Sequence, residues 1–268
     1  MSRPPSRTTA RRAVRVGPRS VASLVVASLV GVAAFGWPLL VTTDSTIGHG
    51  RDAPWVFALL LPVVLAVVLA ELSEGGMDAK AVALLGVLSA IGAVVRPLGG
   101  GTAGVETVFF LIVLGGRVFG PGFGFVLGST TLFASALLTA GVGPWLPFQM
   151  LGSAWVGLGA GLLPRVRGRW ELAMLAGYGA LAGLAYGVLL NLSFWPFAFG
   201  PGSAVSFVPG DAAADNLRRL LAFSLATSLG WDIGRAITTA VLILLTGPVL
   251  LRTLRRAARR AAFTAPGG

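Results

Sequence analysis

The chain has 268 residues, of which 55% are hydrophobic and 12% are charged, and its formal net charge is +11. Because about a quarter of the residues in a soluble domain are charged, this composition excludes an ordinary soluble protein and indicates an integral membrane protein. The sequence contains no cysteine, which excludes a disulfide framework, a thiolate metal site and a cysteine nucleophile.

Arginines cluster in residues 1–19 and again near the C-terminus. Since both clusters flank apolar segments, they indicate cytoplasmic anchors of a membrane protein, and we expect no nucleic-acid partner. The predicted organisation is a basic tail (1–19), two N-terminal transmembrane helices (20–78), a six-helix membrane core (79–251) and a second basic tail (252–268).

Apolar segments that could cross a bilayer, which takes about 20 residues, follow one another along the chain. The predicted spans are 20–41, 54–72, 79–95, 105–119, 121–141, 145–164, 170–191 and a long last one within 216–251. The first is longer than the apolar region of a signal peptide, so we expect it to be retained. An even number of spans puts both termini on the same side of the membrane. The arginine clusters at both ends indicate that this side is the cytoplasm. The predicted fold class is therefore all-α: a multi-pass protein of the cell membrane with about eight transmembrane helices.

Small residues recur at every fourth position in several spans, a spacing that lets helix backbones approach closely inside a membrane. Two such ridges, predicted to pack helices together, are Gly120, Gly124 and Gly128, and Gly179, Gly183 and Gly187. The segment 79–95 carries a further small-residue stripe, formed by the pairs Ala79/Ala83 and Gly86/Ala90. We predict that this stripe receives a helix of a partner protein.

Polar side chains interrupt the apolar spans, and they are Arg96, Glu106, Gln149, Asn191, Asp232 and Arg235. Four of them, Arg96, Glu106, Gln149 and Asn191, are expected near the outer ends. An ionisable group at membrane depth is costly and therefore indicates a functional site. Asp232 and Arg235 lie three residues apart on one helix and can pair, so a structural ion pair is the alternative interpretation for these two.

Aromatic residues gather in the same outer regions. Four tryptophans could offer flat surfaces to a ring-bearing ligand, although each alone could be an interfacial anchor: Trp145, Trp155, Trp195 and Trp231. The segment 192–215 is rich in aromatic residues and contains Pro196, Pro201 and Pro209, which should break any helix. We interpret it as an outer loop, either an interfacial belt or a lid over a cavity.

Catalytic and metal-binding patterns are missing from the sequence. The single histidine, His49, is expected in a loop, and there is neither an HExxH motif nor a phosphate-binding GxxxxGK[ST] loop. The segment 99–104 matches GxGxxG, but no βαβ unit surrounds it. We therefore expect no enzyme activity, no cofactor and no metal site.

The block "GRVFGPGFGFVLGSTTLFASALLTAGVGPWLPFQMLGSAWVGLGAGLLP" (116–164) combines a short inner turn, a glycine-lined helix and an outer "GPW" turn. With the small-residue stripe before it, the chain from about 79 to 251 resembles the substrate-binding (S) components of energy-coupling factor transporters. Those proteins have six helices, so the spans 20–41 and 54–72 are additions to the family pattern.

The resemblance implies that the chain captures a vitamin or related small compound from outside. It would then deliver the compound inward together with a membrane coupling (T) protein and two ATPases. In this family the outer loops hold the ligand; here these are 96–104, 141–145 and 192–215. The stripe at Ala79/Ala83 and Gly86/Ala90 would contact the coupling protein.

The sequence does not assign the substrate. Cobalamin is the first choice among large ring-bearing ligands, with biotin, thiamine, riboflavin, a pyridoxine-like compound and a queuosine precursor as alternatives. A permease that works without ATPase partners and a non-transporting membrane scaffold are the alternative functions. Long aromatic outer loops and short basic inner loops favour transport.

Overall fold

The computed structural model describes residues 17–39, 60–74, 77, 79–99, 102–198 and 202–262. Its helices are α1 (Pro18–Gly36), the short η1 (Trp37–Leu39), α4 (Leu60–Glu74), α5 (Ala79–Gly99), α6 (Phe109–Phe119), α7 (Pro121–Leu138), α8 (Leu146–Leu162), α9 (Arg169–Ala198), α10 (Ala213–Thr227) and α11 (Leu229–Ala262). Most of the tail 1–19, the loop with His49 and Pro201 lie outside the described residues.

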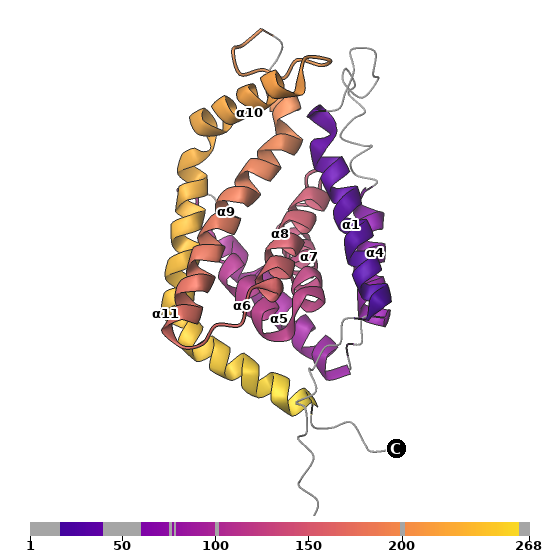
Figure 1. Cartoon of the computed structure of the whole chain (residues 1–268), viewed down its shortest axis with the longest axis vertical. Coiled ribbons are helices and arrows are strands. Elements are labelled where there is room, and N and C mark those ends of the chain that lie inside the picture. Colours follow the sequence, from indigo (N-terminus) through magenta and orange to yellow (C-terminus); the bar gives the residue numbers. More distant parts are fainter. Residues whose placement is uncertain are drawn as a thin grey trace, which may run out of the picture.

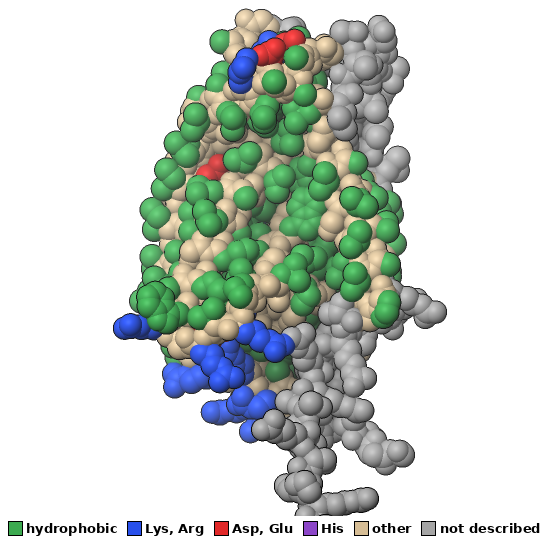
Figure 2. All heavy atoms as spheres, in the orientation of Figure 1, with side chains coloured by type: hydrophobic (Ala, Val, Ile, Leu, Met, Phe, Trp, Pro, Cys, Tyr) green, Lys and Arg blue, Asp and Glu red, His purple; other side chains and the backbone are tan. Residues whose placement is uncertain are grey.

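The helices form an elongated bundle in which α1 begins and α11 ends at the same, lower end (Figure 1). Among the described helices, α1, α5, α7, α9 and α11 are long and apolar enough to cross a membrane. Figure 2 shows hydrophobic side chains over the middle of the bundle and Lys and Arg side chains at its lower end. The predicted fold class is confirmed: the chain is an all-α, multi-pass membrane protein.

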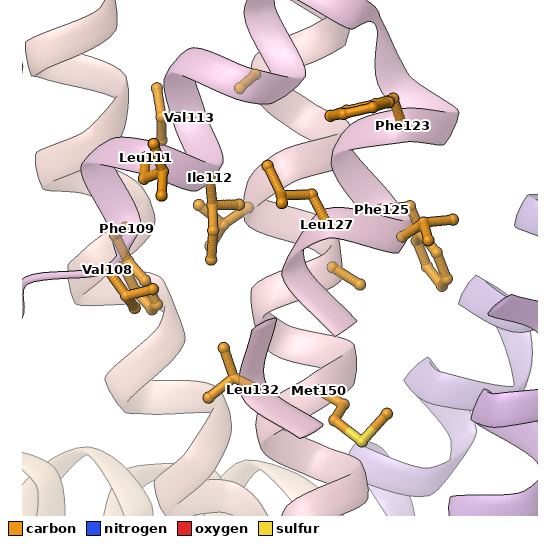
Figure 3. Close-up of a cluster of buried hydrophobic side chains, with 14 of the residues drawn as sticks. Val108, Phe109, Leu111, Ile112, Val113, Phe123, Phe125, Leu127, Leu132 and Met150 are labelled. Atoms are coloured by element: carbon orange, nitrogen blue, oxygen red, sulfur yellow. The ribbon is translucent and has the colours of Figure 1, made fainter. Parts of the chain in front are cut away.

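The centre of the bundle is the packing of α6, α7 and α8, which approach one another through glycines. Gly124 of α7 lies directly against the backbone of Gly157 on α8, and Gly128 lies against the backbone of Ser153. A side chain at either glycine would push the helices apart. Around this contact, Phe109 and Leu127, with the other labelled side chains of Figure 3, fill the space between the helices.

The second glycine ridge lies on α9 and faces α11. Gly179 packs against Thr239 and Ile243 of α11, and Gly187 lies directly against the carboxylate of Asp232. The close approach of these two helices therefore brings the polar start of α11 against α9.

Two helices continue through a proline beyond the ends that the sequence predicts for them. Helix α5 runs past the predicted end at 95 to Gly99 and includes Pro97, and α9 runs through Pro196 to Ala198. Both prolines lie in the last turn of their helix. The missing N–H there costs one hydrogen bond, and no further helical turn follows it. The expectation that Pro196 breaks the helix is therefore wrong, and Arg96 lies on α5.

The predicted last span, 216–251, is two helices. Helix α10 ends at Thr227 and α11 begins at Leu229, and α10 crosses the top of the bundle from α9 to α11 (Figure 1). Helix α10 is amphipathic: Leu220 and Phe223 are buried, whereas Arg218 is exposed. A helix with one apolar and one charged face lies along an interface more readily than it crosses a bilayer.

Helices α1 and α4 pack against α7, α8 and α9. Trp155 of α8 donates a hydrogen bond from Nε1 to Ser28 Oγ of α1 at 3.1 Å, and the Phe35 ring meets the Trp155 ring at 5.5 Å. Val64 and Val68 of α4 are buried. This pair of helices therefore covers one side of the bundle, formed by α7, α8 and α9.

An ion cluster ties the basic end together. Arg117 Nε and Arg255 Nη2 both donate to Glu171 Oε1, at 2.8 and 2.6 Å. Arg117 Nη1 also donates to the carbonyl oxygens of Leu163 and Pro164, each at 3.0 Å. The buried guanidinium of Arg117 thus joins α6, the 163–166 turn and α9. Arg255, on α11, bonds to the same carboxylate and so connects α11 to this cluster.

Candidate functional site

The C-terminal end of α5 places a guanidinium between α7 and α8. Arg96 Nη1 donates to Ser135 Oγ at 3.3 Å, and Arg96 Nη2 donates to Gln149 Oε1 at 3.4 Å. Both acceptors are neutral, and both distances are long for hydrogen bonds. Arg96 and Gln149, predicted separately from the sequence, are therefore brought together in the structure.

The start of α11 supplies a second guanidinium. Arg235 Nη1 donates to Asp232 Oδ1 at 2.6 Å and to the carbonyl oxygen of Gly183 on α9 at 3.3 Å. The guanidinium also lies over the ring of Tyr186, 5.3 Å from its centre. Because Gly187 has no side chain, the Asp232 carboxylate can sit against α9. Asp232 and Arg235 form the expected ion pair, and this pair faces the bundle.

Glu106 lies in the non-helical segment that precedes α6, within electrostatic reach of both arginines. The charges of both Arg96 and Arg235 act on its carboxyl group, which lies against the backbone N–H groups of Thr107 and Val108. Helix α6 has 11 residues, so it extends only about 16 Å, roughly half the thickness of a bilayer core. Irregular backbone inside a membrane is tolerated where protein packs against it. Here Gly104 and Val108 are buried, whereas Thr102, Ala103 and Val105 are exposed.

The segment 102–108 is fixed to its neighbours at both sides. Thr107 Oγ1 donates to the carbonyl oxygen of Val95 at 2.6 Å, and Gly104, at φ +74°, lies directly against the backbone of Trp231. Gly234 of α11 lies against the Ala103 carbonyl oxygen. These contacts hold Glu106 at the junction of α5 and α11.

We call this group of side chains the polar cluster. It consists of Arg96, Glu106, Ser135, Gln149, Tyr186, Asp232 and Arg235. Sequence reasoning missed Ser135 and Tyr186. Tyr186 is one of two tyrosines in the chain and is buried against Phe109, with ring centres 4.8 Å apart. A tyrosine, with its polar hydroxyl, inside a glycine-rich apolar span is the sequence signal that could have identified Tyr186.

The remaining predicted site residues lie elsewhere. Asn191 Nδ2 donates to Ser224 Oγ at 3.0 Å and to Ser228 Oγ at 2.5 Å, which joins α9 to the end of α10. Trp195 is buried in a separate small core with Leu220 and Phe223. Trp145 and Trp231 are both exposed. The tryptophans therefore do not gather around the polar cluster.

The polar cluster is suited to binding a polar ligand. Among the described residues there is no group of three His, Asp or Glu side chains that could hold a metal ion. Instead, two guanidinium groups, two carboxylates, an amide and hydroxyls converge from five helices and one loop segment. Such a set can recognise a polar ligand by hydrogen bonds and charge.

The predicted small-residue stripe lies on the face of α5 that turns away from the bundle, beside larger exposed side chains such as Val87 and Ile91. Ala79, Ala83, Gly86 and Ala90 are all exposed, and no atom lies within 4 Å of where a Gly86 side chain would begin. Helices α1 and α4 pack on α7, α8 and α9 instead. Among the described residues, the predicted partner stripe is therefore not covered by α1 or α4.

The family model described as "ECF transporter, substrate-specific component" matches residues 80–251. The match covers more than half of the chain and every residue of the polar cluster. The chain belongs to the family of substrate-specific components of energy-coupling factor (ECF) transporters. The resemblance inferred from the sequence is thereby confirmed. No curated protein and no solved structure matches the chain.

Membership of the ECF family makes this chain a substrate-specific subunit of a membrane transporter. The family is one of substrate-binding subunits rather than enzymes, and its members generally work with a membrane coupling protein and ATPases. The match begins at residue 80, so α1 and α4 precede it.

Proposed function

We propose that this protein is the substrate-capture subunit of an ECF importer. It binds a vitamin or a related small organic micronutrient on the outer side and delivers it inward with a coupling protein and two ATPases. The observation that carries this proposal is the convergence of Arg96, Glu106, Gln149, Asp232 and Arg235 at one site. Polar groups gathered from distant segments inside a membrane bundle are typical of a substrate pathway.

The arginines support an orientation for the bundle. Arg117, Arg255 and the basic turn 165–169 lie at the end where α11 finishes, and basic residues favour the cytoplasmic side. Arg96 lies in the last turn of α5, at the C-terminal end of that helix. We therefore propose that both termini are in the cytoplasm, that the protein lies in the cell membrane, and that the polar cluster opens to the outside.

We propose a separate role for each segment of the chain. Residues 79–251 form the substrate-binding core, and the exposed stripe of α5 docks to the coupling protein. The two helices within 20–78 form an addition that packs on α7, α8 and α9, so they leave this stripe free. The basic tails 1–19 and 252–268 anchor the chain at the inner surface.

The distribution of tryptophans bears on substrate size. A large ring-bearing ligand such as cobalamin would be expected to stack on Trp145, Trp195 and Trp231. These side chains lie apart, with Trp195 inside its own core. We therefore favour a smaller compound, recognised by polar contacts.

The test is native mass spectrometry of the protein purified in detergent from cells grown in rich medium. We expect a co-purifying small molecule that is lost from the Gln149→Ala variant and kept by Asn191→Ala, because Asn191 lies outside the polar cluster. Retention by both variants would contradict the site. Uptake that persists in cells without ECF ATPases would identify a permease instead.

A further inference from the structure

Two opposite charges of the polar cluster lack a charged partner among the described residues. Arg96 donates to the hydroxyl of Ser135 and to the amide of Gln149, and neither Arg96 nor Glu106 takes part in an ion pair within the described part of the chain. Thr107, the residue after Glu106, donates from Oγ1 to the carbonyl oxygen of Val95, the residue before Arg96, at 2.6 Å. The segments that carry the two charges are therefore in contact, although the charges form no ion pair.

Elsewhere in the bundle the buried charges are paired directly. Glu171 receives both Arg117 and Arg255, and Asp232 receives Arg235 at 2.6 Å. An unpaired charge held away from water costs several kcal/mol unless another group compensates it. Arg96 and Glu106 are each partly buried, and they differ from these pairs in having no direct charged partner among the described residues.

The second guanidinium adds an unused donor. Arg235 Nη1 is occupied by Asp232 and Gly183, but its Nε is buried and has no hydrogen-bond partner among the described residues. Arg96 likewise has N–H groups beyond the two that contact Ser135 and Gln149. The region between α5, α8 and α11 therefore offers spare cationic donors and one carboxylate acceptor.

From this arrangement we infer that the substrate carries both a carboxylate and an N–H donor. The carboxylate pairs with Arg96, whose planar fork suits a carboxylate, and the N–H donor bonds to Glu106. This inference rests on the proposed function, because it assigns the chemistry of the same site. It separates organic acids from cationic vitamins such as thiamine and from uncharged ones such as riboflavin.

The experiment compares matched acids and neutral analogues by their effect on the melting temperature of the purified protein. The pairs are biotin with biotinamide, pantothenate with panthenol, and 4-aminobenzoate with 4-aminobenzamide; thiamine, riboflavin and pyridoxine complete the panel. At least one acid should raise the melting temperature, whereas its neutral analogue at equal concentration should not.

Variants then locate the effect. Arg96→Gln should weaken the affinity for that acid by about 30-fold or more, whereas Arg96→Lys should recover part of it. Glu106→Gln should weaken the affinity less, because an amide oxygen still accepts a hydrogen bond. Arg218→Gln is the matched control, since Arg218 is exposed on α10 and pairs with Asp215 at the surface.

The outcomes separate the two proposals. Stabilisation by a neutral analogue as strong as by its acid, or by thiamine or riboflavin alone, would overturn the charge assignment and leave the importer intact. An acid that Arg96→Gln binds as well as the unchanged protein does would also overturn it. A protein that no compound stabilises would count against substrate capture itself.

Discussion

Arg117 is the residue whose contacts join the most segments at the basic end. Its side chain is 7% exposed and it bonds to Glu171 and to three carbonyl oxygens of the 163–166 turn. Removing one partner of a buried ion pair leaves an uncompensated charge and unsatisfied acceptors, which is more costly than losing an exposed pair. Here Arg255 still neutralises part of the Glu171 charge.

We therefore expect Arg117→Ala to lower the free energy of unfolding by about 3 kcal/mol. Thermal unfolding in detergent, followed by tryptophan fluorescence, measures the loss. Arg252→Ala is the control, because Arg252 is exposed and its Nε bonds to the Pro248 carbonyl oxygen within its own helix. Equal melting temperatures for the two variants would show that the buried cluster does not stabilise the fold.

At the scale of elements, the contact between α7 and α8 depends on the absence of a side chain at Gly124. A Cβ there would overlap the backbone of Gly157, and backbone cannot move aside as a flexible side chain can. Overpacking of a close contact typically costs about 1–3 kcal/mol. Within a helix, however, alanine is intrinsically better than glycine by about 1 kcal/mol, so the two effects oppose each other.

Gly124→Ala should consequently lower the melting temperature, whereas Gly177→Ala should raise it or leave it unchanged. Gly177 lies on α9, is exposed and has no atom within 4 Å of the point where an added Cβ would lie, so only the helix preference acts there. The measurement is the melting temperature of each variant, compared with that of the unchanged protein. A rise for both would mean that α7 and α8 are free to separate.

At the scale of the whole molecule, the sequence could predict which residues are unusual but not which of them meet. Arg96, Glu106 and Asp232 stand out because charge is costly in an apolar span. Their convergence depends on helix rotation, which hydropathy does not determine. On α9, for example, Tyr186 and Asn191 are five residues apart and point about 140° away from each other. Tyr186 consequently joins the polar cluster, whereas Asn191 faces α10.

The helices themselves were easier to predict than their ends. Each predicted span contains a helix, since a long apolar run in a membrane leaves the backbone few alternatives. The division at Ser228 was missed because α10 is amphipathic and continues directly into the apolar start of α11. The path of residues 102–108 depends on contacts with Trp231 and Gly234, far away in the sequence.

The open stripe on α5 leads to a prediction about the assembled transporter. Gly86 and Ala90 are exposed on the side that α1 and α4 leave uncovered, away from the polar cluster. Larger side chains there would keep a partner helix at a distance, because close approach in a membrane needs small residues. The bundle itself would tolerate them, since nothing lies over Gly86.

The double variant Gly86→Leu with Ala90→Leu should abolish uptake by cells that supply the coupling protein and ATPases, while ligand binding by the purified subunit stays unchanged. Gly177→Leu, which adds one leucine side chain to the exposed face of α9, should keep both activities. Loss of binding in the double variant would mean that α5 was distorted. Full uptake would show that the coupling protein docks elsewhere, and the faces of α9 and α11 would then be the next to test.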